Sequence, residues 1–115
     1  MKPSKPDSKE RIEHIIDAIE KIERFNKKHT LLSFLKDDKS FFATLYQYTI
    51  IGEAVANIDL KILDKYNYPW YKVKSFRNFI LHEYHAIDER VIWDTTKHIL
   101  PDLKSMMKQI LKNEF

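Results

Sequence analysis

Residues 77–84, RNFILHEY, combine a cation, an amide, an imidazole and a phenol in one short segment. Histidine titrates near neutral pH, so His82 can take a proton from a ribose 2′-hydroxyl or give one to a leaving oxygen. Arginine stays charged, so Arg77 can hold a phosphate through two hydrogen bonds. These residue types suit phosphodiester cleavage that needs no metal, with Arg77 and His82 as the catalytic residues.

Two further side chains of this segment support the same chemistry. Asn78 lies one turn before His82 and can orient its imidazole or donate to the phosphate, while Tyr84 adds a hydroxyl and a ring for base stacking. An isolated Arg-x4-His pattern also arises by chance, and a histidine on a helix is more often structural than catalytic. Taken alone, the motif therefore favours a structural role.

Helical geometry separates the two catalytic candidates. At 100° per residue, Arg77 and His82 are about 140° apart around a helix. Either the long arginine reaches around the helix or a second molecule completes the site. A two-fold homodimer would answer this, because isologous packing brings the same helix end from both subunits together, with two arginines and two histidines in one pocket.

The composition limits the fold and the location. A chain of 115 residues predicts one domain, residues 1–115, with a flexible start over residues 1–8. A single glycine and four prolines disfavour many short strands, so we predict an all-α protein. The absence of cysteine excludes disulfides and thiol catalysis, and no apolar run is long enough for a membrane span. A cytoplasmic protein with no membrane association fits these observations.

Apolar periodicity predicts the helices that position the motif. They cover residues 8–27, 31–35, 40–56, 70–82 and 92–110. We expect Ser8 and Thr30 to cap the first two, and residues 67–69, Asn-Tyr-Pro, to break the chain before the motif helix. In the last helix, a stripe keeps its phase across Pro101, which indicates one helix kinked there or two helices in phase: Ile92, Thr96, Ile99, Leu103, Met106 and Ile110.

The helix over residues 40–56 carries two apolar stripes. The first contains Phe41, Leu45, Tyr48, Gly52 and Val55, and the second contains Phe42, Thr49 and Ala56. This pattern predicts burial on more than one side. Glycine costs about 1 kcal/mol relative to alanine inside a helix, so Gly52 indicates the close approach of another helix.

Three segments occur together in one order: IIGEAVANI, YPWYKVKSFRNFILHEYHAID and VIWDTTKHILPDL. In this combination the chain resembles the HepT family of HEPN-domain proteins, over roughly residues 8–113. The family signature Arg-x4-His-x-Tyr is matched by Arg77, His82 and Tyr84. The resemblance implies the HEPN fold, an up-down bundle of four to five helices that forms a homodimer.

The resemblance also implies a function. Such proteins are metal-independent endoribonucleases without a cofactor, which act on RNA as the toxin of a type II or type VII-like toxin–antitoxin pair. The cognate antitoxin is a minimal nucleotidyltransferase that adenylylates the signature tyrosine, here Tyr84. The expected site is catalytic Arg77 and His82, supported by Asn78 and Tyr84.

Other readings remain open at this point. The chain could be a non-catalytic binding partner and substrate subunit of the nucleotidyltransferase, or a plain dimeric scaffold. An intact Arg77, Asn78 and His82 set favours the nuclease over the scaffold but does not separate it from the partner subunit. His82 and His85 have a spacing that metal pairs use, but no third ligand is nearby except acidic residues that suit a solvated helix start, so we predict no metal.

Overall fold

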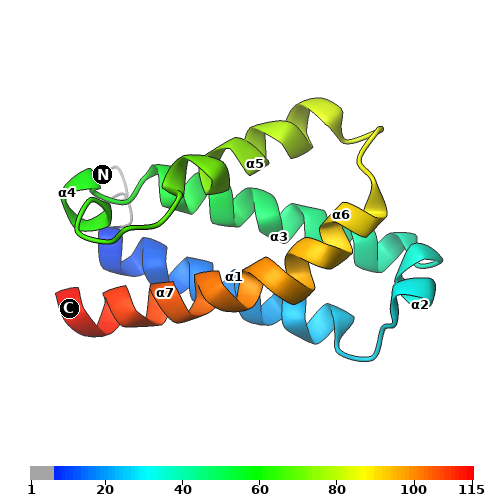
Figure 1. Cartoon of the computed structure of the whole chain (residues 1–115), viewed down its shortest axis with the longest axis horizontal. Coiled ribbons are helices and arrows are strands. Elements are labelled where there is room, and N and C mark those ends of the chain that lie inside the picture. Colours follow the sequence, from blue (N-terminus) through cyan, green and yellow to red (C-terminus); the bar gives the residue numbers. More distant parts are fainter. Residues whose placement is uncertain (1–6) are drawn as a thin grey trace, which may run out of the picture.

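The computed structural model describes residues 7–115, and these residues form helices and turns without any strand. The long helices run up and down beside one another (Figure 1). The α-helices are α1 (Ser8–Asn26), α2 (Leu31–Leu35), α3 (Asp38–Ala56), α4 (Leu60–Leu63), α5 (Trp70–Glu83), α6 (Glu89–Asp94) and α7 (Leu100–Glu114). The predicted all-α fold is confirmed, and none of the described helices is long and apolar enough to cross a membrane.

The N-cap of the first helix lies one residue earlier than predicted. The Asp7 carboxylate accepts a hydrogen bond from the backbone N–H of Glu10 at 2.8 Å and so caps α1, which Ser8 was predicted to do. Ser8 is instead the first helical residue, and its hydroxyl accepts a bond from the Asp59 N–H. An aspartate at this position also places negative charge at the positive end of the helix dipole. Of the start that was predicted to be flexible, residues 1–8, only Asp7 and Ser8 are described, and residues 1–6 lie outside the described part of the chain.

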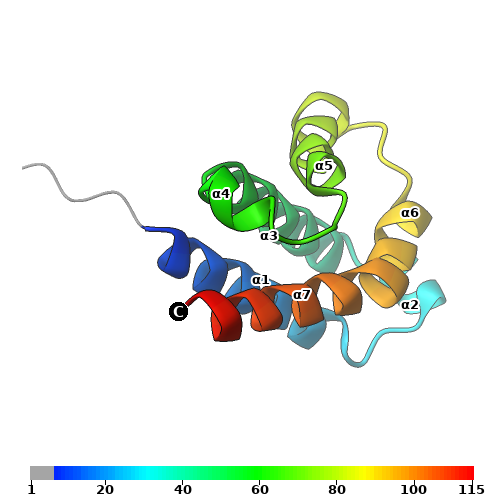
Figure 2. The same ribbon diagram turned by 60° about the vertical axis from the view of Figure 1, so that its left-hand side comes forward.

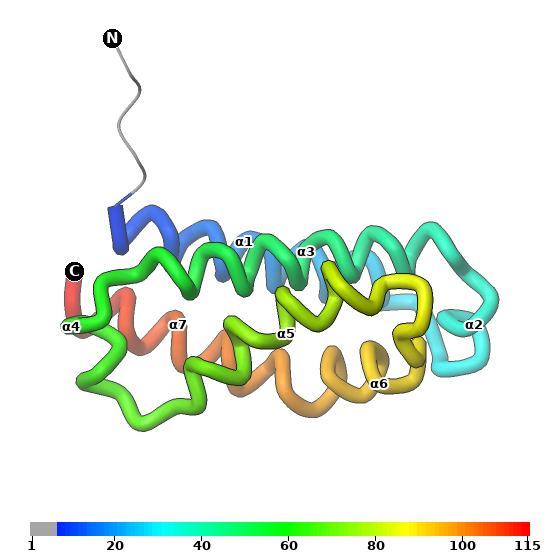
Figure 3. Tube along the Cα trace, turned by 90° about the horizontal axis from the view of Figure 1, so that it is seen from above, coloured from blue at the N-terminus to red at the C-terminus, as the bar shows by residue number. Residues whose placement is uncertain are grey.

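The core forms where α1 packs against α3 and α7. The inward isoleucines of α1 are fully buried: Ile12, Ile15, Ile19 and Ile22. In contrast, α5 packs mainly on α3 and stands off from α1 and α7 in Figure 2, while Figure 3 shows it crossing the bundle obliquely. The helix that carries the motif is therefore an outer layer of the bundle, held mainly by α3.

An indole anchors the start of α5. Trp70 is buried, and its Nε1–H donates to the carbonyl oxygen of Leu63 at 3.1 Å. The ring of Tyr68 packs against Trp70 with centroids 4.8 Å apart. The predicted break at residues 67–69 is confirmed, and these contacts fix the end of α5 that is farther from His82.

The position of α5 on α3 depends on Gly52. A Cβ atom at Gly52 would lie 2.5 Å from the Cβ of Arg77 and 3.3 Å from the carbonyl oxygen of Val73. Contacts this short leave no room for a side chain. The predicted close approach of another helix at Gly52 is confirmed, and the residue that approaches is the signature arginine itself.

The two stripes of α3 differ in burial. The first stripe is buried, as predicted, but in the second Phe42 is 56% exposed and Ala56 is exposed. The predicted burial of α3 on more than one side is confirmed, because α1, α2 and α5 all pack on it, but the second stripe does not lie on the buried sides. An aromatic strip is left uncovered, since Tyr46 is also 63% exposed.

The last helical run is continuous but changes its winding before Pro101. A π-helical turn, η1 (Thr95–Ile99), joins α6 to α7, and the Leu100 N–H donates to the carbonyl of Thr95, five residues back. The wider turn adds one residue between successive buried positions of the helix. It lies next to Pro101, which has no backbone N–H to donate. The predicted stripe is therefore wrong at Ile99, which is 55% exposed, and Leu100 is buried instead.

We expect Gly52→Ala to lower the free energy of unfolding by about 1–3 kcal/mol, because the added methyl group would overlap Arg77 and force α5 away from α3. Helix propensity alone predicts the opposite sign, a gain of about 1 kcal/mol. Urea denaturation followed by circular dichroism measures the change. A variant as stable as the wild type would contradict the close packing.

Candidate active site

The Arg77 guanidinium is held by two polar neighbours. Its Nε donates to the Glu53 carboxylate at 3.0 Å, and its Nη1 donates to the Asn78 side-chain oxygen at 3.2 Å. The Arg77 side chain is 34% exposed. Of its five N–H groups, these contacts use two, so three have no partner among residues 7–115 and point to a capacity for binding an anion.

Glu53 is itself held from its own helix. Asn57, the C-cap residue of α3, donates from its side-chain nitrogen to the carbonyl of Glu53 at 2.8 Å and to the second carboxylate oxygen at 3.4 Å. A polar chain thus runs from Asn57 through Glu53 and Arg77 to Asn78. It ties the signature segment of α5 to the end of α3.

A cavity of about 280 Å³ lies beside Arg77. Three helices line it: Arg11 and His14 from α1, Thr49, Ile50, Glu53 and Ala54 from α3, and Arg77 and Leu81 from α5. It presents two guanidinium groups and an imidazole around a single carboxylate. This balance of charge suits a phosphate or another anion.

His82 and Tyr84 lie at the other end of the signature. His82 is exposed in the last turn of α5, and Tyr84 follows the helix, 62% exposed, with its ring edge-on to His85 at 5.3 Å. His82 lines a different part of the surface from the cavity beside Arg77. The structure therefore joins Asn78 to Arg77 but does not bring Arg77 and His82 together, as the helical geometry predicted for a single chain.

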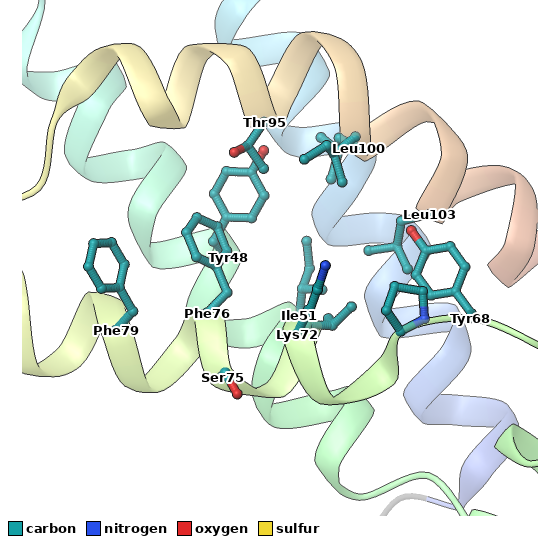
Figure 4. Close-up of a pocket in the computed structure, with 13 residues that line it drawn as sticks. Tyr48, Ile51, Tyr68, Lys72, Ser75, Phe76, Phe79, Thr95, Leu100 and Leu103 are labelled. Atoms are coloured by element: carbon teal, nitrogen blue, oxygen red, sulfur yellow. The ribbon is translucent and has the colours of Figure 1, made fainter.

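A larger cavity lies elsewhere. It measures about 500 Å³ between α5 and the run from η1 to α7, and rings of Tyr48, Phe76 and Phe79 face it (Figure 4). Among its lining residues in the described part of the chain, only Lys72 carries a charge. The Tyr48 hydroxyl bonds to Thr96 at 2.7 Å, and burial raises the pKa of Tyr48. The lining of this cavity is mostly apolar and lacks the groups that phosphate chemistry requires.

A second histidine cluster has the residue types of a hydrolase. The two ring nitrogens of His29 lie 2.8 Å from the Ser33 hydroxyl and 2.9 Å from the Ser40 hydroxyl, and Asp37 is 3.2 Å away. Hydrogen bonds from Ser40, with the nearby His29, lower the pKa of Asp37. Ser33 also closes a capping box with Thr30, and Asp37 caps α3. Ser33 and Asp37 thus already serve to cap α2 and α3, and His29 links these two helix starts.

Metal ligands do not gather in residues 7–115, where no group of three histidine, aspartate or glutamate side chains could hold an ion.

Comparison with known proteins decides the family. The model of the HepT-like family, described as "Ribonuclease HepT-like", matches residues 15–110. The chain belongs to the HepT-like ribonuclease family. The resemblance seen in the sequence is thereby confirmed, and the family is one of RNA-cleaving enzymes.

Curated relatives cover almost the whole chain. A probable ribonuclease HepT from Thermococcus cleftensis is 38% identical over 90% of this chain and 96% of its own length. A putative RNase from Caldanaerobacter subterraneus subsp. tengcongensis is 32% identical over 90% of this chain and 93% of its own length. A putative RNase from Methanocaldococcus jannaschii is 27% identical over 95% of this chain. No solved structure matched the chain.

Three residues that surround Arg77 are not evident from the sequence alone. Glu53, Arg11 and His14 lie far from the signature in sequence and meet it only through packing. The sequence offered an indication for Glu53, because it directly follows Gly52, the residue at which the close approach of another helix was predicted. No comparable signal marked the two residues on α1.

Proposed function

We propose that the protein is a metal-independent endoribonuclease in which Arg77 binds the scissile phosphate and His82 transfers a proton. The proposal rests on the guanidinium of Arg77, which is oriented by Glu53 and Asn78 and keeps three N–H groups for an anion beside a second arginine. Membership of a ribonuclease family makes an RNA phosphodiester the natural anion. Asn78 serves as a support for the arginine.

The reaction needs two proton transfers. The ribose 2′-oxygen attacks phosphorus while a base takes its proton, and the bond from phosphorus to the 5′-oxygen breaks as an acid protonates that oxygen. The products are a 2′,3′-cyclic phosphate and a 5′-hydroxyl. His82, first as the base that accepts the 2′-hydroxyl proton and then as the acid that gives a proton to the 5′-oxygen, would supply both transfers.

A homodimer would bring His82 of one subunit to Arg77 of the other. Phe42 and Tyr46 are exposed on the face of α3 that continues to Thr49, and Thr49 borders the cavity beside Arg77 together with Leu81, which is also exposed. An apolar strip next to a half-complete site supports a second copy of the chain as its cover.

The dimer predicts complementation between dead variants. Arg77→Ala and His82→Ala proteins, mixed and allowed to exchange subunits, should recover about a quarter of the wild-type cleavage rate, because half of the dimers are mixed and each then has one intact site of two. Sedimentation should show a dimer at micromolar concentration. A monomer, or no recovery after proven subunit exchange, would contradict a site shared between subunits.

The single variants test the catalytic roles. His82→Ala and Arg77→Ala should each reduce RNA cleavage by about 10²- to 10⁴-fold while the fold is kept, because general acid–base catalysis typically contributes this much. His98→Ala, which removes another exposed histidine, is the control and should cleave normally. Activity should survive EDTA.

Two outcomes would count against this mechanism. Cleavage that requires added metal would contradict the metal-independent mechanism. Absence of cleavage by the pure wild-type protein would favour the non-catalytic partner of a nucleotidyltransferase instead.

We further propose that the protein is the toxin of a toxin–antitoxin pair whose minimal nucleotidyltransferase adenylylates Tyr84. The Tyr84 oxygen would attack the α-phosphorus of ATP, lose its proton and release pyrophosphate. Tyr84 is accessible for this, being exposed just after α5 and two residues from His82. The added phosphodiester would bring negative charge to a site that must receive RNA phosphate.

Tyr84→Phe tests this regulation. The variant keeps the ring but lacks the acceptor oxygen, so it should still arrest growth while escaping its partner. Intact mass after incubation with partner, ATP and magnesium should show AMP on the wild type and none on Tyr84→Phe. Tyr71→Phe, which removes the hydroxyl of a similarly exposed tyrosine, should be labelled normally. Equal labelling of the Tyr84→Phe protein would place the modification elsewhere.

A further inference from the structure

Glu53 contacts the signature arginine in a way that leaves its phosphate-binding end open. The carboxylate accepts from Nε, on the side of the guanidinium, and Asn78 accepts one hydrogen from Nη1. One hydrogen on Nη1 and two on Nη2 have no partner among residues 7–115. These two nitrogens form a fork that matches two oxygens of a phosphate.

The neighbouring contacts fix both ends of Arg77. At the backbone, Gly52 lets α3 approach so closely that a methyl group at position 52 would lie 2.5 Å from the Cβ of Arg77. At the tip, the adjacent Glu53 holds Nε, and Asn57 holds Glu53 in turn. Two consecutive residues of α3 thus determine where the guanidinium lies and how it is turned.

We propose that Glu53 is a positioning residue of the ribonuclease, which orients the Arg77 guanidinium so that Nη1 and Nη2 face the scissile phosphate. This inference rests on the proposed function of Arg77. A free arginine samples many rotamers, and orienting it in advance reduces the entropy lost when the phosphate binds. Correct placement of the clamp also governs how well the reacting groups are aligned.

The opposite role makes a different prediction. If Glu53 competed with RNA for the arginine, its removal would strengthen RNA binding and lower KM. The single contact to Nε argues against competition, because a carboxylate in the place of the phosphate would take the fork of two nitrogens instead.

Kinetics of Glu53 variants distinguish these roles. Glu53→Ala should lower kcat/KM for a short RNA by about 10- to 100-fold, the cost of a misplaced group. Glu53→Gln should stay close to the wild type, because its amide oxygen still accepts from Nε. Glu23→Ala is the matched control, since Glu23 forms a similarly exposed ion pair with Lys104 at 2.8 Å on another part of the surface.

A second readout follows the arginine without relying on cleavage. In ¹H–¹⁵N spectra, the Nε–H of Arg77, assigned by its loss in Arg77→Ala, should be protected from solvent exchange in the wild type and in Glu53→Gln. Protection should disappear in Glu53→Ala. In an Arg77→Ala background, Glu53→Ala should cause no further loss of activity, because Glu53 acts through the arginine.

The outcomes separate this inference from the function on which it rests. A wild type that cleaves RNA, with Glu53→Ala equally active or lower in KM, would overturn the positioning role alone. An unchanged Nε–H signal in Glu53→Ala would overturn it as well. A wild type without any RNA cleavage would overturn the proposed function, and the spectra would still show whether Glu53 holds Arg77.

Discussion

The close contact between α3 and α5 at Gly52 determines the geometry of the candidate site. Because glycine has no side chain, α5 approaches until the Cβ of Arg77 occupies the space that a methyl group would need. The same approach brings Glu53 within ion-pair distance of the arginine and closes one side of the cavity that α1 completes. Helix packing and the chemistry of the site therefore depend on one position.

The sequence predicts those features that local spacing encodes. Apolar periodicity and helix-capping residues mark most of the helices, and the isolated Gly52 marks a close approach. Local spacing does not encode the π-turn before Pro101, because its cost is small and the packing around Thr96 and Leu100 decides which hydrogen bonds form. One added residue was enough to turn Ile99 outward.

The candidate site shows the same division. Residue types make Arg77 and His82 the candidates, and helical spacing predicts that they lie on different faces of α5, as they do in the structure. The pairing of Arg77 with Glu53 joins two helices, and Arg11 and His14 come from a third. Such contacts arise from tertiary packing, which a single sequence does not reveal.

The one-sided support of α5 has a consequence for its dynamics. In a helix of 14 residues, Trp70 and Ile80 are the buried side chains, whereas α1 buries six residues in 19. Segments with little burial open locally at a lower free energy than the whole domain. Any molecule that binds to the outer side of folded α5 shifts the equilibrium away from local opening by mass action. The order of the signature helix is thus coupled to whatever binds there, and its amide exchange reports on occupancy.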